Sequence, residues 1–388
     1  MKILSIFGTR PEAIKMAPLV KRLALESKVI SLICVTGQHR SMLQQVMDVF
    51  QITPDFDLDI MAPSQTLNSI GSRIFSTLDP ILERVSPDRV LVHGDTTTAA
   101  IAGLAAFHRR IPVAHVEAGL RTGDLSQPWP EEMNRRVLDV ISDLLLVPTL
   151  GAKNHLKLEN LQGRIVVTGN TVIDALEMII QRFNDDPLLA AHVDSHLPSL
   201  DSNRRLLLVT GHRRENFGDG FLGICNALAM LAQRTDMEIV YPVHLNPNVQ
   251  EPVNRILSGL KNVHLIAPVD YLSFVRLMQR AHVILTDSGG VQEEAPSLGK
   301  PVLVMRDVTE RPEAVSAGTV QLVGTNPEQI VAAVTRLYDR PAEYLRISQV
   351  TNPYGDGLAC DRIVDTLMGR ETREFMPSLE QEVLEQAS

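Results

Sequence analysis

The sequence has few of the residues that mark disulfide scaffolds, membrane proteins and secreted proteins. Its three cysteines, Cys34, Cys225 and Cys360, are far apart, and no CxxC pair occurs. Widely separated thiols are typical of a reducing compartment. No run of residues approaches the ~18 uninterrupted apolar residues of a membrane span, and the apolar start breaks at Gly8, too early for a signal-peptide core. We therefore predict a cytoplasmic protein.

A surplus of basic residues is also missing. The chain has 37 Lys and Arg against 46 Asp and Glu, a formal net charge of −9. General nucleic-acid binders and membrane-surface binders present a basic field, so neither kind of partner is predicted. An anionic substrate would need a local cationic site in this acidic protein.

The usual fingerprints of bound cofactors and metals are not found. The chain has no GxGxxG or Walker sequence, so dinucleotide or ATP binding is not indicated. Four histidines follow or end predicted strands, namely His93, His115, His212 and His244. None has the HExxH or finger spacing of a zinc site. We predict neither a metal nor a cofactor.

The chain does contain a regular alternation of short apolar runs with helix-length segments. The runs are continuously apolar, as expected for strands of a parallel sheet with helices on both faces. They are Ile3–Phe7, Val29–Thr36, Arg89–His93, Ile111–Val116 and Leu144–Val147, then Leu206–Val209, Ile239–Val243, Val263–Ile266, Val283–Leu285, Val302–Met305 and Val320–Val323. Two such arrays in 388 residues predict two doubly wound, Rossmann-like α/β domains. A (β/α)₈ barrel is the alternative, but about a dozen strands are too many for it.

The predicted domain boundary lies between Gly169 and Ser202. Helix Val172–Phe183 is followed there by a polar, Pro-containing stretch. We assign residues 1–170 to the first domain and residues 171–357 to the second. The tail, residues 358–388, is predicted as one or two helices that can pack back on the first domain.

In open α/β sheets, ligands bind beyond the carboxyl ends of the strands. After the first strand come Arg10, Pro11 and Lys15. Proline suits a first helical turn, whose free N–H groups favour an anion. Arg10 and Lys15 are therefore predicted to face a diphosphate, and an ordinary strand-to-helix turn is the alternative.

Three carboxylates are the candidate acid/base groups of the first domain. Asp95 follows a strand, although it could simply cap the next helix. Glu117 ends a buried strand, where an acid is costly without a partner, and an ion pair with Arg121 is the alternative. Glu131 begins a helix four residues before Arg135, a spacing that also suits an ordinary surface pair.

The second domain carries the candidate phosphate site. His212 and Arg213 follow a strand and a glycine, an arrangement suited to an anion, although solvated arginines are the alternative. Ser288, Gly289 and Gly290 open a helix and would expose backbone N–H groups to phosphate, unless they form only a capped helix. A glutamate just behind them could accept hydrogen bonds from ribose hydroxyls.

Nine motifs in order resemble those of the non-hydrolysing UDP-N-acetylglucosamine 2-epimerases of bacteria. They run from residue 7 to residue 314, and NPYGDG extends the match to residue 357. The motifs are FGTRPEAIKMAP, HGDTTT, HVEAGLRTGD, PWPEEMNRR, GNTVIDAL, TGHRREN, YPVHLNPNV, DSGGVQEEAPSLGKPVL and TERPEA.

The resemblance implies a fold like that of the GT-B glycosyltransferases, with the active site in the interdomain cleft, and a homodimer. It implies reversible conversion of UDP-GlcNAc to UDP-ManNAc without NAD, by loss of UDP to 2-acetamidoglucal and its return, for bacterial surface polysaccharide. By match of motif, the catalytic residues are Asp95, Glu117, Glu131 and His212. The matched substrate-binding residues are Arg10, Lys15, Arg135, Arg213, Phe274 for uracil, Ser288, Gly289, Gly290, Glu294 for ribose, and Arg311. A second, activating UDP-GlcNAc would bind Gln38, Arg213 and His244.

Three other functions share the predicted nucleotide site. A hydrolysing epimerase would release free ManNAc, and a retaining GT-B glycosyltransferase would transfer the sugar. A UDP-sugar sensor would bind without turnover. None of these needs to keep Asp95, Glu117 and Glu131 together.

Overall fold

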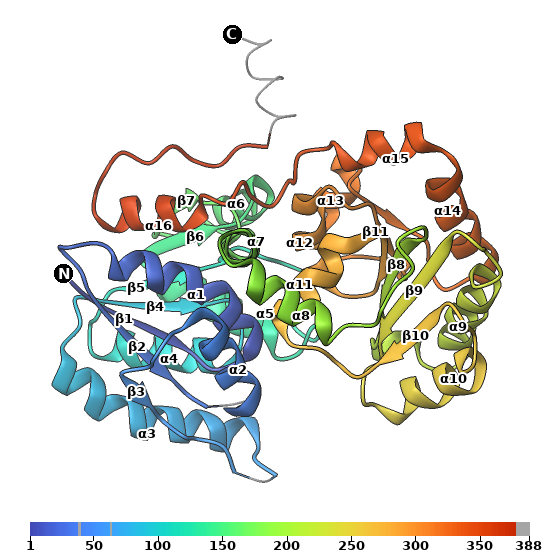
Figure 1. Ribbon diagram of the computed structural model, residues 1–388. Coiled ribbons are helices and arrows are strands. Elements are labelled where there is room, and N and C mark those ends of the chain that lie inside the picture. The colour runs from blue at the N-terminus through green and yellow to red at the C-terminus, as the bar shows by residue number, and fades with distance from the viewer. Residues whose placement is uncertain (38–39, 63, 378–388) are drawn as a thin grey trace. The chain divides into compact units, whose positions relative to one another are not determined.

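The computed structural model describes residues 1–37, 40–62 and 64–377. The chain folds into two compact α/β units, drawn in Figure 1. The first unit comprises Met1–Ala175 and Tyr354–Met376, and the second comprises Leu176–Pro353. Each unit holds one open parallel sheet, so the predicted pair of doubly wound domains is confirmed and the barrel is excluded.

The first sheet has the strand order β3-β2-β1-β4-β5-β6-β7. The chain starts at β1 and builds outward in both directions, so the order reverses between β1 and β4. Ligands of such sheets bind beside this point of reversal. The strands are β1 (Lys2–Phe7), β2 (Ile30–Val35), β3 (Phe56–Asp57), β4 (Arg89–His93), β5 (Val113–Val116), β6 (Leu144–Val147) and β7 (Arg164–Val167).

Helices cover both faces of this sheet (Figure 1). They are α1 (Arg10–Ala24), α2 (Arg40–Phe50), α3 (Leu67–Val85), α4 (Thr97–His108), α5 (Glu131–Ile141), α6 (Leu150–Leu158), α7 (Thr171–Asp185) and α16 (Ala359–Leu367). The boundary between the units falls inside α7. Apolar side chains of α3 and α4 pack on β1 and β4, and these strands are fully buried along most of their length.

The returning helix α16 packs against α1 in the first unit. Arg22 Nε lies 2.5 Å from Asp361 Oδ1 at this contact. Asp174 of α7 accepts hydrogen bonds from the backbone N–H groups of Cys360, at 2.7 Å, and Ala359, at 3.3 Å. Burial nevertheless raises the pKa of Asp174 to about 6. The carboxyl thus caps the start of α16 from a helix far away in sequence.

The second sheet has the order β10-β9-β8-β11-β12-β13, with its reversal between β8 and β11. The strands are β8 (Arg205–Thr210), β9 (Met237–Pro242), β10 (Val263–Ile266), β11 (Ala281–Thr286), β12 (Val302–Val304) and β13 (Val320–Leu322). The helices are α8 (Pro187–Ser195), α9 (Asp219–Leu231), α10 (Pro247–Leu257), α11 (Tyr271–Arg280), α12 (Gly289–Glu294), α13 (Pro312–Ala317), α14 (Pro327–Asp339) and α15 (Pro341–Ser348).

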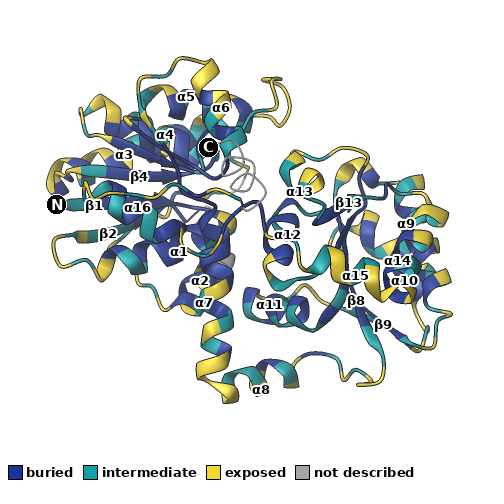
Figure 2. Ribbon diagram, turned by 90° about the horizontal axis from the view of Figure 1, so that it is seen from above, coloured by how far each residue is buried: buried dark blue, intermediate teal, exposed yellow. Residues whose placement is uncertain are grey.

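The central strands of the two sheets, among them β4, β5 and β8, are almost fully buried, and dark blue ribbons mark the buried residues in Figure 2. In the second unit Phe221 and Tyr241 are fully buried, and the Tyr241 hydroxyl donates a hydrogen bond of 2.9 Å to the Gly211 carbonyl.

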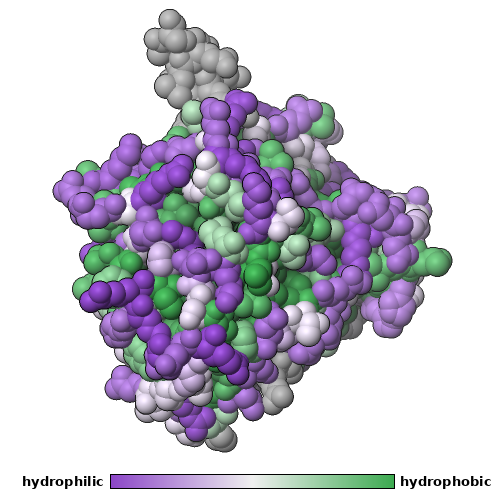
Figure 3. Space-filling view, turned by 90° about the vertical axis from the view of Figure 1, so that its left-hand side faces the viewer, coloured by the Kyte–Doolittle hydropathy of each residue, from purple (hydrophilic) through white to green (hydrophobic). Residues whose placement is uncertain are grey.

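Figure 3 shows one face of the molecule, on which hydrophilic side chains surround smaller groups of hydrophobic ones. Within residues 1–37, 40–62 and 64–377, no helix is long and apolar enough to cross a bilayer.

The stretch after residue 184, interpreted from the sequence as polar and irregular, contains helix α8. Asp186 is its N-cap and accepts hydrogen bonds of 3.1 Å from the N–H groups of Leu188 and Leu189. Pro187 occupies the first helical turn. An Asp-Pro pair is a helix start signal, so this helix could have been predicted from the sequence.

Two glycines at equivalent places in helices test how tightly the units are packed. A Cβ on Gly223 of α9 would lie 2.4 Å from the Thr325 carbonyl oxygen, whereas one on Gly71 of α3 would lie 3.5 Å from Ile101. We expect G223A to lower the free energy of unfolding by about 1–3 kcal/mol, the usual cost of overpacking. The matched G71A should raise it by about 0.5–1 kcal/mol, because alanine favours the helix. Urea unfolding measures both, and equal effects would contradict the described packing.

Candidate active site

Glu117 directly follows β5 and has a φ of 65°, in the left-handed region. Its carboxylate forms an ion pair with Lys15 of α1, and Asn170 Nδ2 donates a hydrogen bond of 3.0 Å to the same oxygen. The side chain is 11% exposed. The partner considered from sequence, Arg121, instead pairs with Asp139 at 2.7 Å. Lys15 therefore lies against an acid in this structure.

Asp95 follows β4, the neighbouring strand, and forms an ion pair of 2.5 Å with Arg135 Nη2 of α5. Asp95 does not cap α4. Thr96 is the N-cap, and its hydroxyl accepts a hydrogen bond of 3.1 Å from the Ala99 N–H. Because β4 and β5 are adjacent in the sheet, Asp95 and Glu117 leave neighbouring strand ends.

Arg135 is held from behind by Glu132, a residue that the sequence analysis did not select. Glu132 is fully buried, and its carboxylate lies 3.1 Å from Arg135 Nη1. Burial alone would raise the pKa of Glu132, but N–H donors of Thr122 and Gly123, with Arg136 and Arg135, hold it below its usual range. The alternative considered from sequence, a Glu131–Arg135 pair, does not form, and Arg135 pairs with Glu132 instead.

Two predicted site residues of the first unit begin helices and are partly exposed. Glu131 starts α5 and Arg10 starts α1. Within the described part of the chain, neither side chain has a hydrogen bond or ion pair to another residue. Both groups are therefore available to a ligand. In α1 it is Glu12 that completes the capping box with Thr9.

His93, the last residue of β4, is a buried histidine beside Glu117. Its Nε2 lies 3.7 Å from Glu117 Oε2, and neither ring nitrogen has a hydrogen-bond partner among the described residues. Burial lowers the pKa of His93 to about 4, although the Glu117 charge acts in the opposite direction. The ring is therefore neutral at physiological pH.

In the second unit, Asp287 anchors the loop that carries His212. Asp287 follows β11, is fully buried, and accepts hydrogen bonds of 2.8 Å from the N–H groups of His212 and Arg213. The His212 side chain is 48% exposed and stacks on His244 with ring centroids 5.0 Å apart. Burial, and then the neighbouring His212, lower the pKa of His244. Gln38, the third residue of the predicted second ligand site, lies outside the described residues.

Ser288, Gly289 and Gly290 form the start of α12, where Ser288 is the N-cap. The Ser288 side chain makes no capping hydrogen bond to α12. Arg311 lies against this turn, since a Cβ on Gly289 would be 2.7 Å from its guanidinium carbon. A cation and open backbone N–H groups together suit a phosphate.

Acidic residues hold the cations of this second unit in place. Arg311 Nε donates a hydrogen bond of 2.8 Å to Glu293 Oε1. Glu310 lies 3.5 Å from Arg213 Nη1 and 3.0 Å from Arg306 Nη1. Burial would raise the pKa of Glu310, but hydrogen bonding to Arg306 and the surrounding arginines lower it to about 2. Arg213 is therefore paired, rather than merely solvated.

The remaining predicted contacts lie on or near α11. The Tyr271 hydroxyl donates a hydrogen bond of 2.8 Å to Glu294 Oε2. Phe274, on the same helix, is half-buried. Both groups belong to the unit that carries Ser288–Gly290.

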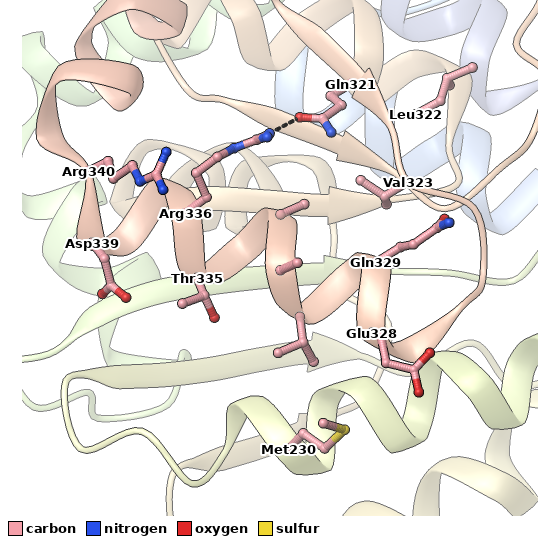
Figure 4. A pocket seen from close by; sticks show the side chains of 13 residues that line it. Met230, Gln321, Leu322, Val323, Glu328, Gln329, Thr335, Arg336, Asp339 and Arg340 are labelled. Carbon is pink, nitrogen blue, oxygen red and sulfur yellow. Dashed lines mark hydrogen bonds between the residues drawn. The ribbon is translucent and has the colours of Figure 1, made fainter.

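A separate cavity of about 830 Å³ lies elsewhere in the second unit. It is formed by α14, β13 and Met230 of α9, and Figure 4 shows Arg336 hydrogen-bonded to Gln321 within it. None of the catalytic or ligand-binding residues predicted from the sequence lines this cavity.

Comparison with solved structures shows the type of fold. The fold is that of the GT-B glycosyltransferases: the spinosyn rhamnosyltransferase has a TM-score of 0.57 at 15% identity, over 94% of this chain and 100% of that chain. Paired α/β units with cations and helix N–H groups at the strand ends fit an enzyme that acts on nucleotide-linked sugars.

The sequence comparisons then show the family. The family model described as UDP-N-acetylglucosamine 2-epimerase matches residues 21–368, and the chain belongs to this family. The chain is 57% identical to the UDP-N-acetylglucosamine 2-epimerase of Yersinia pestis, over 96% of this chain and 99% of that protein. A crystal structure of UDP-GlcNAc 2-epimerase from Neisseria meningitidis bound to UDP-GlcNAc has a TM-score of 0.88 at 49% identity, covering 95% of this chain and 100% of that chain. The resemblance read from the motifs is confirmed, and the protein is an isomerising enzyme.

The neutral state of His93 gives a prediction on pH. The folded protein holds the His93 pKa at about 4, below its ordinary 6.5. Between these values the unfolded chain binds a proton that the folded chain does not, so this contribution to stability is complete above pH 6.5 and is lost as the pH falls towards 4. We expect the variant H93Q to show a flatter rise of unfolding free energy with pH in this window. H192Q, at an exposed histidine, should keep the wild-type slope, and an unchanged slope in H93Q would contradict the assignment.

Proposed function

We propose that the protein interconverts UDP-GlcNAc and UDP-ManNAc by inversion at C2, without releasing free sugar. The observation that carries the proposal is the pair of strand-end carboxylates, Asp95 and Glu117, each with its own cation in the first unit. Membership of the family supports it, as does the relative from Neisseria meningitidis whose structure is named as bound to UDP-GlcNAc.

The chemistry explains why both carboxylates and phosphate-binding groups are needed. The C2 hydrogen of GlcNAc is not next to a carbonyl in the ring, so a side chain alone cannot remove it. In the proposed route the C1–O bond breaks and its electron pair leaves with UDP. A carboxylate takes the C2 proton, and C1 and C2 become doubly bonded in 2-acetamidoglucal. UDP then returns to C1 while a proton is delivered to the other face of C2. The route uses no redox cofactor, because no step transfers a hydride: only a proton and UDP leave and return.

Departure of UDP needs groups that stabilise the charge developing on the diphosphate. We assign this role to Arg10, Arg213 and Arg311, together with the Ser288 hydroxyl and the backbone N–H groups of Gly289 and Gly290 at the start of α12. The Ser288 N–H itself donates a hydrogen bond of 3.0 Å to the Thr286 hydroxyl. Glu294 would accept hydrogen bonds from the ribose, and Phe274 would contact the uracil. The Tyr271–Glu294 hydrogen bond supports this assignment, because it fixes the carboxylate that the ribose would meet.

Proton transfer at C2 needs an acid/base group for each face. We assign it to Asp95, Glu117 and Glu131, of which Asp95 is paired with Arg135 and Glu117 with Lys15. The family match adds His212 as a catalytic group, and its half-exposed ring is consistent with contact to substrate. The closed state of the enzyme would also keep water from the glucal.

Three further features of the proposal come from the resemblance. A homodimer and a cytoplasmic location are expected, with the product feeding bacterial surface polysaccharide. Arg213 and His244, with Gln38, would bind a second UDP-GlcNAc as activator. The His212–His244 stack supports this by placing one candidate activator contact directly on a catalytic one.

Incubation with UDP-GlcNAc in D₂O tests the reaction itself. We expect deuterium at C2 of both UDP-sugars at equilibrium, without added NAD or metal, because the proton removed exchanges with solvent before its return. Mass spectrometry and NMR of the sugars measure the result. Release of free ManNAc would indicate the hydrolysing reaction instead, and binding without exchange would indicate a sensor.

Variants of the carboxylates test their roles. D95N, E117Q and E131Q should each lower kcat by about 10²–10⁴-fold, the usual contribution of an acid/base group, while the Kd for UDP barely changes. R311A is the contrasting variant and should raise the Kd for UDP by about 10-fold or more, the scale of one charge-assisted hydrogen bond. Steady-state kinetics and calorimetry separate the two outcomes. Loss of UDP affinity in the carboxylate variants would show that those residues are structural.

A further inference from the structure

A histidine–aspartate pair lies buried beneath the strand ends that carry Asp95 and Glu117. His115 of β5 is fully buried, and Asp139 of α5 is 1% exposed. His115 Nδ1 lies 2.7 Å from Asp139 Oδ1. Neither residue is among the acid/base or substrate-binding residues discussed above.

The contacts of this pair define its protonation. His115 Nε2 lies 2.6 Å from the Gly94 carbonyl oxygen, which can only accept, so Nε2 must carry a hydrogen. The other oxygen of Asp139 lies 2.7 Å from Arg121 Nη2 and accepts a hydrogen bond of 3.3 Å from the Gly119 N–H.

These donors mark Asp139 as an ionised carboxylate. Burial would raise the pKa of Asp139, but His115 and Arg121 hold it below its usual range. A carboxylate also only accepts hydrogen bonds, so His115 Nδ1 must carry a hydrogen as well. The ring is an imidazolium ion between an anion and a carbonyl oxygen.

The other ionisable groups around the ring are compatible with this charge. Arg121 is beyond Asp139 and is itself paired with Glu159 at 2.7 Å. His93, on the adjacent strand β4, is neutral, and the Lys15 charge beyond it is balanced by Glu117. His115 and Arg121 thus each contact one oxygen of Asp139, both at 2.7 Å.

The pair fastens two glycine turns, one beside each candidate acid/base residue. Gly94 immediately precedes Asp95 and has a φ of 66°, and Gly119 comes two residues after Glu117 and has a φ of 83°. His115 donates a hydrogen bond to the carbonyl oxygen of Gly94 in the first turn. Asp139 accepts a hydrogen bond from the N–H of Gly119 in the second turn. A displacement of the pair would therefore move both carboxylates together.

We propose that the His115–Asp139 ion pair is a positioning device that sets the placement of Asp95 and Glu117 for proton transfer at C2. This rests on the proposed function. Neither residue is assigned contact with substrate. Its effect is on the rate of the chemical step, because a misplacement of about 1 Å can lower catalysis by on the order of 100-fold.

The variant D139N tests this with little change of shape. Its amide oxygen can still accept from Arg121 and the Gly119 N–H, while its NH₂ group faces His115 Nδ1 and favours the neutral ring. We expect kcat to fall by about 10–100-fold with KM and the Kd for UDP unchanged. D143N is the matched control, since Asp143 forms an exposed pair with Arg89 in the same unit and should leave kcat unaltered.

Nitrogen-15 NMR of the His115 imidazole measures its protonation directly in the wild-type protein, without any substitution. We expect a hydrogen on both ring nitrogens of His115, because each nitrogen faces an acceptor oxygen. A neutral ring in the wild type, or an unchanged kcat in folded D139N, would overturn the proposal. Absence of C2 exchange in the wild type would instead refute the proposed function, and the protonation of His115 would still be measured on its own.

Discussion

A carboxylate removed from water needs a positive partner, and this requirement organises the strand ends of the first unit. Glu117 is paired with Lys15, Asp95 with Arg135, and Asp139 with Arg121. An unpaired buried charge would cost several kcal/mol or lose its ionisation. Each cation comes from a different segment, so the α/β fold must be complete before any of these pairs forms.

The pairs have a consequence for chemistry as well as for stability. A carboxylate that is paired with a fixed cation keeps its position, so its oxygen can stay directed at the proton that it exchanges. Glu132 holds Arg135, and the His115–Asp139 pair holds the two glycine turns. The partners of the candidate carboxylates are therefore themselves held in place by buried side chains. Preorganisation of this kind lowers the cost of reaching the transition state. Glu131, without such a partner in the described chain, is the one candidate carboxylate that has freedom to adjust.

In the second unit it is the arginines that need partners of opposite charge. Arginines lie at the proposed phosphate site, and each is paired with an acid: Arg311 with Glu293, and Arg306 with Glu310 and Glu215. A chain of net charge −9 can therefore present a local cationic surface to an anion. Asp287 has a different task, since it binds backbone N–H groups and so places the loop that carries His212.

The sequence was sufficient for the fold class and for most strands, because continuous apolar runs such as Arg89–His93 and Leu144–Val147 are local signals and match β4 and β6. It missed the two edge strands of the first sheet, β3 and β7, which are short and carry polar residues. It also identified the confirmed family, through motifs at the strand ends. It could not show which cation meets which acid. Asp95 and Arg135 are 40 residues apart, and the nearer candidates, Glu131 for Arg135 and Arg121 for Glu117, proved wrong once the strands were placed. Glu132 was passed over because a buried acid beside an exposed one gives no local signal.

The most direct test of the account is a crystal structure of the E117Q variant with UDP-GlcNAc bound. We expect the diphosphate to contact Arg311 and the N–H groups of Gly289 and Gly290. We also expect a carboxylate oxygen of Asp95 or Glu131 within about 3–3.5 Å of the sugar C2, the separation from which a proton can be transferred. A bound nucleotide whose C2 lies beyond the reach of Asp95, Glu131 and the residue at position 117 would contradict it.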